Sequence, residues 1–161
     1  MGMSFCVIAL GKLREPFFRA AADEYLKRCR RYGAIEEIEL PDLPEPSHDS
    51  AALVQQVLDK EAESILARVK PSDYVIALAI EGKQLDSLEM SAHLSVLQAS
   101  EAKRIVFIIG GSLGLGQAVL ARANERLSLS RLTFPHQMAR VMLLEQLYRS
   151  CKIAANERYH K

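Results

Sequence analysis

This chain is poor in cysteine and lacks long apolar runs and metal-ligand spacings. Its three cysteines, Cys6, Cys29 and Cys151, are odd in number and far apart, and no C-x-x-C pair occurs. This usage indicates neither a disulfide framework nor a zinc or other metal site, and it favours a reducing cytoplasm. No apolar run reaches the roughly 18 residues of a membrane span, so no membrane association is expected. The first residues lack the basic leader and cleavage site of a signal peptide, and residues 5–10 fit a strand better.

The glycine-rich stretch after an apolar strand lacks the signatures of common nucleotide-binding loops. The glycines between residues 110 and 116 do not fit the dinucleotide fingerprint G-x-G-x-x-G, and no acid follows about 20 residues later to bind a ribose. Gly111 and Gly116 have the spacing of a phosphate loop, but Gln117 and Ala118 replace its lysine and hydroxyl. The stretch is therefore either an ordinary turn or a place where a flat ligand approaches bare backbone.

Charge is unevenly distributed, although the whole chain carries a net charge of only +1. Residues 1–100 hold 11 Lys and Arg against 16 Asp and Glu, whereas residues 101–161 hold 10 against 4. A polyanionic partner is therefore expected to meet the C-terminal third. A second basic cluster, Lys27-Arg28-Cys29-Arg30-Arg31, ends a predicted helix, where cations also suit the helix dipole without any partner.

Predicted strands and helices alternate along the chain. Strands are expected at residues 5–10, 35–40, 74–80, 104–109 and 125–129, and helices at residues 15–31, 50–69, 87–99, 117–123 and 135–155. Strands interleaved with helices in this way predict an α/β fold with a mainly parallel sheet. No repeat or linker divides the chain, so a single domain is expected over residues 1–161.

Three loops are expected at the carboxyl ends of the last three strands, at residues 80–83, 110–116 and 130–134. Ligands of parallel sheets bind at this edge. The three loops together therefore predict a ligand site.

Several specific blocks of sequence resemble a known family. The block SLSRLTFPHQMARVMLLEQLYRSCKI follows the paired glycines, and the sequence ends in Tyr159-His160-Lys161. The segments VIALGK, EYLKRC and VIALAIEGK match too. On these residues the chain resembles, over essentially its whole length, the RlmH (YbeA) family of SPOUT-class RNA methyltransferases.

This resemblance implies a fold and an activity. It implies a SPOUT-type sheet flanked by helices with a deep C-terminal trefoil knot, which patterns alone would not predict because chains usually avoid knots. It also implies a homodimer that uses S-adenosylmethionine to methylate N3 of pseudouridine 1915 in 23S ribosomal RNA, within the assembled ribosome. Carried over motif by motif, the cofactor site falls on Leu78, Gly110, Leu129, Ser130, Arg131, Leu132, Thr133 and Phe134.

The candidate catalytic side chains lie in the last predicted helix and the residues after it. His160 is the predicted proton-handling group, and Tyr159 is expected to stack on the target base or bond its edge. Residues so close to a C-terminus are often frayed, and the resemblance is what favours a catalytic role. Glu145 and Arg149 share a helix face, either as an ordinary ion pair or with Arg149 meeting RNA and Glu145 orienting it. His136 starts the helix, where capping and catalysis are equally open.

The last predicted helix carries more apolar surface than one face needs, at Met138, Val141, Met142, Leu144, Leu147, Tyr148 and Cys151. A dimer interface would bury the surplus, and so would a central position within one chain.

Two other classes of function stay open. One is a nucleotide-dependent oxidoreductase or NTPase. The lack of a dinucleotide fingerprint and of a complete phosphate loop argues against it. The other is a non-enzymatic ribosome-binding module, against which the glycine loop and the Tyr-His tail argue.

Overall fold

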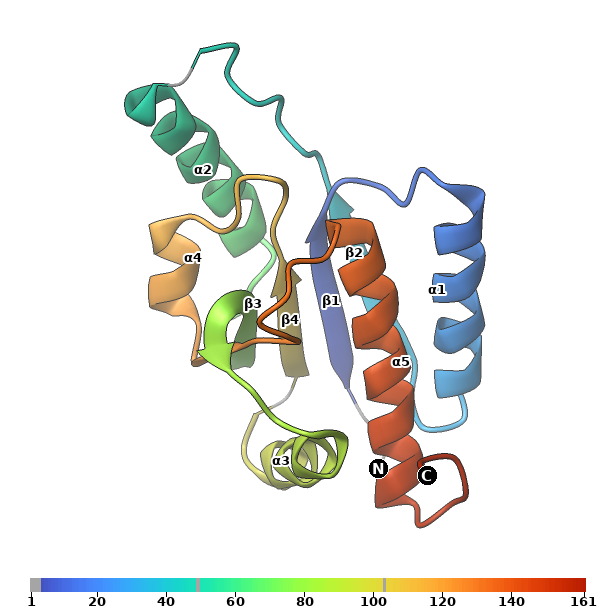
Figure 1. Cartoon of the computed structure of the whole chain (residues 1–161). Coiled ribbons are helices and arrows are strands. Elements are labelled where there is room, and N and C mark those ends of the chain that lie inside the picture. The colour runs from blue at the N-terminus through green and yellow to red at the C-terminus, as the bar shows by residue number, and fades with distance from the viewer. Residues whose placement is uncertain (1–3, 49, 103) are drawn as a thin grey trace.

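The computed structural model describes residues 4–48, 50–102 and 104–161, which form a five-stranded sheet between two layers of helices (Figure 1). The elements, in chain order, are β1 (Phe5–Leu10), α1 (Pro16–Cys29), β2 (Ile35–Leu40), α2 (Ala51–Leu66), β3 (Asp73–Lys83), α3 (Ser87–Ala99), β4 (Arg104–Ile109), α4 (Gln117–Arg122), β5 (Glu125–Leu127) and α5 (His136–Ala154). The strands lie in the order β2-β1-β4-β3-β5, and every neighbouring pair is parallel. The predicted α/β class is therefore confirmed, whereas the trefoil knot stays a prediction.

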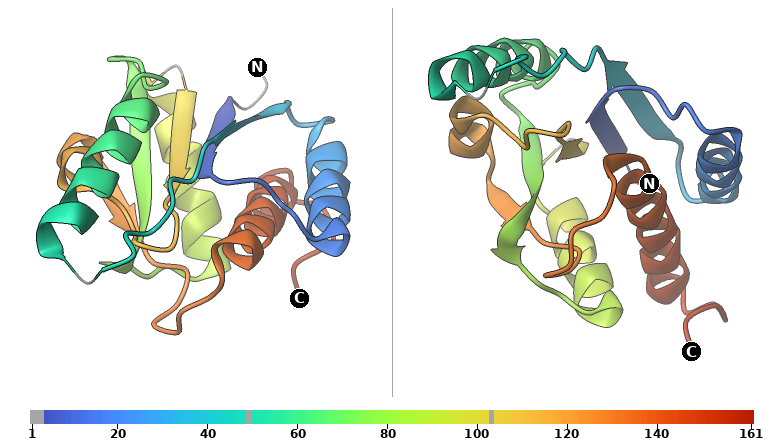
Figure 2. Two further views of the ribbon diagram at one scale, coloured as in Figure 1. Left: turned by 90° about the horizontal axis from the view of Figure 1, so that it is seen from above. Right: turned by 45° about the horizontal axis from the view of Figure 1, so that its top comes forward.

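Alternate residues of the central strands face opposite helix layers. In β1, Phe5 and Val7 pack in the cluster that contains α1, α3 and α5, whereas Cys6 and Ile8 pack in the cluster that contains α2 and α4. Seen from above, α1 and α2 lie on opposite sides of the sheet (Figure 2). Side chains of a strand alternate between the two faces. A strand covered on both faces is therefore apolar throughout, as the sequence of β1 is.

The largest departure from the predicted elements is at the end of β3. The sequence predicts that this strand ends at residue 80 and that a loop follows, and this prediction is wrong, because β3 continues to Lys83. Leu78 and Lys83 both pair with Leu127, so the register shifts across an irregularity between them. Gly82 permits the close approach, because a Cβ there would lie 2.7 Å from the main chain of β5.

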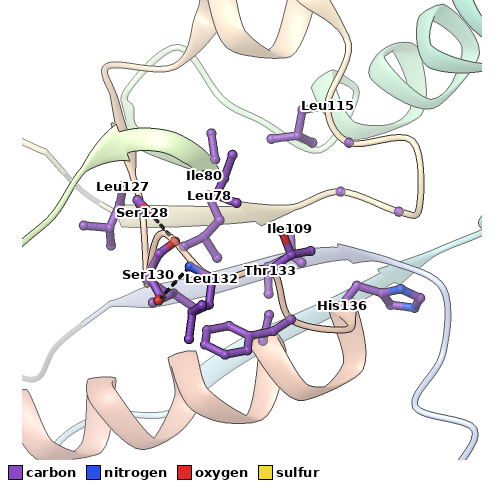
Figure 3. Close-up of a pocket in the computed structure, with 17 residues that line it drawn as sticks. Leu78, Ile80, Ile109, Leu115, Leu127, Ser128, Ser130, Leu132, Thr133 and His136 are labelled. Carbon is purple, nitrogen blue, oxygen red and sulfur yellow. Dashed lines mark hydrogen bonds between the residues drawn. The ribbon is translucent and has the colours of Figure 1, made fainter.

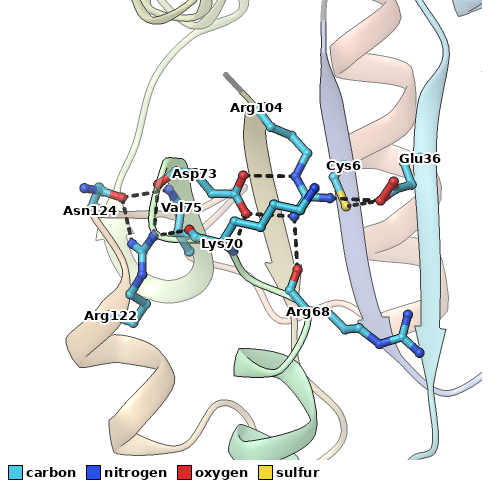
Figure 4. Close-up of polar contacts among 9 residues, drawn as sticks. All are labelled: Cys6, Glu36, Arg68, Lys70, Asp73, Val75, Arg104, Arg122 and Asn124. Atoms are coloured by element: carbon cyan, nitrogen blue, oxygen red, sulfur yellow. Dashed lines mark hydrogen bonds and ion pairs between the residues drawn. The ribbon is translucent and has the colours of Figure 1, made fainter. Parts of the chain in front are cut away.

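An ion pair between Asp73 and Arg104, with the Asp73 side chain fully buried, links the amino ends of β3 and β4 (Figure 4). Arg104 Nη2 lies 2.7 Å from Asp73 Oδ2, and Arg104 Nη1 lies 2.9 Å from Glu36 Oε1 on β2. Burial acts to raise the pKa of Asp73, but hydrogen bonds from Arg104 and from the Lys70 amide outweigh it and hold that pKa below its usual value. This network stabilises the sheet at the edge opposite the strand carboxyl ends.

Helix α5 packs against both α1 and α3. Leu144, Leu147 and Cys151 are at most 3% exposed and Tyr148 is 8% exposed, whereas Met138 remains 40% exposed. Much of the apolar surplus of α5 is thus buried within one chain and gives little support for a dimer interface. In the part of the chain that the structure describes, neither α5 nor any other helix combines the length and apolarity that crossing a membrane requires.

Candidate functional site

A pocket opens at the carboxyl edge of the sheet, between the ends of β3 and β4, the loop after β5 and the start of α5 (Figure 3). Seven of the eight residues predicted to hold a cofactor line it: Leu78, Gly110, Leu129, Ser130, Leu132, Thr133 and Phe134. The eighth, Arg131, is exposed and is not part of the lining. The pocket lies where ligands of parallel sheets bind.

The glycine turn after β4 contributes main chain to the pocket wall. The Gly114 amide donates to the Gly111 carbonyl at 3.1 Å, and Gly114 has a φ of +85°. That conformation favours glycine. A Cβ on Gly110 would lie 2.5 Å from the Gly114 carbonyl oxygen. The absence of a side chain at Gly110 therefore allows the turn to pack closely, and it also leaves room for a ligand in the pocket.

Two serines shape the loop after β5 (Figure 3). The Ser128 hydroxyl donates to the Ser130 carbonyl at 2.9 Å, and the Ser130 hydroxyl accepts from the Leu132 amide at 3.0 Å. Short side chains that bond nearby main chain in this way stabilise turns. The loop thus holds its bend through its own residues.

The lining of the pocket is mainly apolar. Among the described residues that form it there is no Lys, Arg, Asp or Glu, and His136 is the one titratable side chain. A phosphate group would find no cation here, whereas a flat ring would pack against side chains such as Leu78 and Ile109. The pocket therefore suits an adenosine-like ligand without phosphate better than a triphosphate or a dinucleotide. Across the described residues, no three His, Cys, Asp or Glu side chains gather so as to hold a metal ion.

Arg140, which sequence patterns did not single out, anchors the start of α5 beside this pocket. Its side chain is 1% exposed, and its Nη1 lies 2.6 Å from Glu39 Oε2 and 3.3 Å from Glu37 Oε2. Its Nη2 donates to the Gly11 carbonyl at 2.9 Å. These bonds fix the first turns of α5 against the ends of β1 and β2, and His136 of that helix lines the pocket. Glu37 and Glu39 lie two residues apart in β2 and therefore on one face of the sheet. This spacing was the one feature of the sequence that could have predicted a buried cation next to them.

The four candidate catalytic residues lie together at the far end of α5. The Tyr159 hydroxyl donates to Glu145 Oε1 at 3.0 Å, and Arg149 donates to the same oxygen. Arg149 Nη1 lies 3.1 Å from Nδ1 of the exposed His160. The structure thus brings Glu145, Arg149, Tyr159 and His160 into one cluster, and the tail is folded back rather than frayed.

Hydrogen bonds within this cluster set which of its side chains donate hydrogen bonds and which accept them. Burial and the hydrogen bond to Glu145 raise the pKa of Tyr159 to about 12, so its hydroxyl stays protonated and donates at neutral pH. The hydrogen bond to Glu145 also raises the pKa of Arg149. An arginine only donates, so His160 accepts at Nδ1 and a neutral His160 carries its proton on Nε2. In this arrangement His160 can donate a hydrogen bond from Nε2. Its Nδ1 is free to accept a proton only after Arg149 moves away.

His160 also lines a second pocket, together with the start of α3, Met142 and Gln146. The second pocket shares Leu127, Ser128 and Leu129 with the first one. Within a single chain, the tail therefore reaches the neighbourhood of the candidate cofactor pocket by folding back over α5.

Known proteins resemble this chain along its length. Residues 3–160 match the family described as a predicted SPOUT methyltransferase. Relatives named ribosomal RNA large subunit methyltransferase H, from Bacillus pumilus and Exiguobacterium sibiricum, are 45% and 46% identical over 159 residues, which is 99% of this chain and 100% of each relative.

Solved structures resemble it in fold. A probable methylase family protein from Haemophilus influenzae aligns with a TM-score of 0.56 at 14% identity, over 100% of this chain and 72% of the other. A probable methyltransferase from Bordetella pertussis aligns with a TM-score of 0.56 at 18% identity, over 92% and 96%. At these identities the likeness concerns the fold alone, whereas the sequence match identifies the family. The chain therefore belongs to the RlmH family of SPOUT methyltransferases.

Proposed function

We propose that this protein is a cytoplasmic 23S ribosomal RNA methyltransferase that uses S-adenosylmethionine to methylate N3 of pseudouridine 1915 in the assembled ribosome. The observation that carries the proposal is the meeting of two pockets across Leu127 to Leu129, one lined by seven predicted cofactor residues and the other by His160. A methyl donor and an acceptor base in these pockets would lie side by side. The name of the relatives, ribosomal RNA large subunit methyltransferase H, supports RNA as the substrate class.

The first pocket fits the proposed cofactor in its chemistry. S-adenosylmethionine, when bound, supplies an electrophilic methyl group and needs no metal. Leu78, Gly110 and the loop 129–134 would hold it, because their lining offers apolar surface and main chain and carries no Lys or Arg side chain for a phosphate.

The second pocket is the proposed place of the target base. Gln146 is held there on two sides, because its Nε2 donates to Glu145 Oε2 at 2.8 Å and its Oε1 accepts from Ser87 Oγ at 2.8 Å. His160 Nε2–H can donate to a base carbonyl, on which negative charge builds as N3 loses its proton to solvent water. Alternatively, His160 accepts that proton once Arg149 has left Nδ1. Both roles make His160 necessary for turnover.

The homodimer is also part of the proposal. Ile80, Leu132 and Met138 are 51%, 71% and 40% exposed, and the first two line the cofactor pocket. A second copy packed over them would bury apolar surface and exclude water from the site.

Methyl transfer to whole ribosomes tests this function. Ribosomes that lack the modification are incubated with the protein and labelled S-adenosylmethionine, beside protein-free 23S RNA. We expect label in the ribosomes only, and mass spectrometry should place it on pseudouridine 1915. A thermal-shift panel runs in parallel. Stabilisation by NAD or ATP instead of S-adenosylmethionine would favour a nucleotide-dependent enzyme, and ribosome binding without transfer would favour a binding module.

A further inference from the structure

Tyrosines and cations from two distant segments meet where α1 and α5 end. We call this region the tyrosine–cation surface and define it by residues 24–33 and 145–161. These two segments hold eight Lys and Arg against three Glu, although the whole chain has a net charge of +1. Basic charge is thus concentrated at this end of the molecule.

Contacts between rings and cations hold the surface together. The Tyr148 ring lies 6.3 Å from that of Tyr25, 6.4 Å from that of Tyr32 and 4.9 Å from that of Tyr159, between centroids. The Arg28 guanidinium lies 5.5 Å and 5.7 Å from the Tyr25 and Tyr148 centroids. Such cation–π contacts orient an arginine, and Glu24 partly neutralises Arg28, because Arg28 Nε lies 3.6 Å from Glu24 Oε2. Tyr148 therefore joins the rings of Tyr25 and Tyr32, from the first segment, to the ring of Tyr159 in the tail.

Several cations of this surface are available to a partner. Lys27 and Arg30 are exposed, and within the described residues their side chains make no hydrogen bond or ion pair. Arg31 is partly neutralised by Glu157 at 3.3 Å. The helix dipole accounts for cations in the last turn of α1. It does not account for their convergence with Arg149 and the other cations of the tail, more than 100 residues later.

We propose that the tyrosine–cation surface binds the phosphate backbone of ribosomal RNA beside the target nucleotide. The identity of the RNA rests on the proposed function. Cations bind phosphates regardless of sequence and fix the register of a nucleic acid, and half-buried tyrosine rings next to them suit unpaired bases. Tyr159 belongs to both the surface and the candidate catalytic cluster. RNA held on the surface is therefore continuous with RNA that enters the second pocket.

The test compares two double variants that each remove two exposed cations. Lys27→Gln/Arg30→Gln changes the tyrosine–cation surface. The matched control, Lys60→Gln/Arg68→Gln, changes α2 and the turn after it, on the other face of the sheet. Ribosome binding is measured by sedimentation at several salt concentrations, and methyl transfer is measured as kcat and KM.

We expect the first variant to raise KM and Kd roughly tenfold with kcat nearly unchanged. The slope of log Kd against log salt should fall by about 1 for each phosphate that the variant no longer neutralises. The control should match the wild type. An unchanged KM and salt slope in the first variant, or equal weakening in the control, would overturn the inference. Tighter binding of polyglutamate, an anionic polypeptide, than of ribosomes would also overturn the inference. If the wild type transfers no methyl group, the proposed function fails. The binding measurement then still decides whether this surface binds RNA.

Discussion

The ring of Tyr159 meets the ring of Tyr148 edge-on, with centroids 4.9 Å apart and planes at 73°. Tyr148 is buried in α5, so this contact and the hydrogen bond to Glu145 hold the last residues against the helix. Residues so close to a C-terminus are often frayed, but here they are docked on α5, so their removal is expected to cost some stability. The tail combines a packing role with its proposed catalytic role, and experiments on it must separate the two.

Deletion of Tyr159-His160-Lys161 should abolish methyl transfer and leave the affinity for S-adenosylhomocysteine unchanged. The free energy of unfolding should fall by about 1–2 kcal/mol, because the deletion removes one aromatic pair and one hydrogen bond. Calorimetric titration and urea unfolding measure the two effects, and deletion of Lys161 alone is the control. Full methylation by the truncated protein would refute the catalytic role and leave Arg149 and Glu145 as the better candidates.

His160→Ala should lower kcat by about 100-fold or more and change KM little, because the imidazole acts on charge that builds during the reaction. Tyr159→Phe keeps the ring contact and removes the hydrogen bond to Glu145, so it separates bonding from stacking. His48→Ala, which changes an exposed histidine without a proposed role, is the control. A kcat for His160→Ala equal to that of the wild type would contradict the assignment.

Gly110→Val should weaken S-adenosylmethionine binding by about tenfold to a hundredfold, equivalent to about 1–3 kcal/mol of overpacking. The new Cβ would lie 2.5 Å from the Gly114 carbonyl oxygen, so the turn must move and the pocket wall with it. Ser112→Val places the same valine side chain at an exposed position of the same turn, and this variant should bind normally. Unchanged affinity in Gly110→Val would place the cofactor elsewhere.

Asp73→Asn should destabilise the protein by about 3–5 kcal/mol at pH 7, because it leaves Arg104 without its buried partner. The folded-state pKa of Asp73 lies below its usual value of 3.8, so the stability contributed by this carboxylate is present above that pH and is lost as the pH falls through the folded pKa. Urea unfolding between pH 3 and pH 7 should therefore show a flatter acid limb in the variant. Glu81→Gln, in an exposed pair with Arg126, should change stability by less than about 1 kcal/mol. An equally steep acid limb in Asp73→Asn would show that other groups dominate.

The protein should form a homodimer in which the second copy covers Met138, near the start of α5, together with Ile80 and Leu132. Met138→Glu should shift it toward the monomer, because a charge would replace an apolar side chain that is 40% exposed on this helix. Light scattering at micromolar concentration measures both states. A stable wild-type monomer that still methylates ribosomes would rule out the dimer.

The pattern of apolar residues alone determined the class of fold. All five strands and all five helices lie within a few residues of their predicted positions, because strands buried on both faces read as continuous apolar runs, as residues 5–10 and 105–109 do. The order of strands and glycine turns also determined which edge of the sheet would bear a pocket. The choice of particular lining residues came from the resemblance to a family, since a loop such as 129–134 has no periodicity to interpret.

Tertiary structure decided the contacts between residues that are far apart in the chain. Arg140 pairs with Glu39 across 101 positions, and no local pattern states which acid a helix arginine will meet. The continuation of β3 to Lys83 depends on pairing with Leu127 in a strand formed later in the chain. The docking of Tyr159 likewise depends on the side chains that α5 turns toward the tail. Local sequence sets the intrinsic preferences of each segment, whereas burial and pairing with distant partners settle where such side chains finally lie.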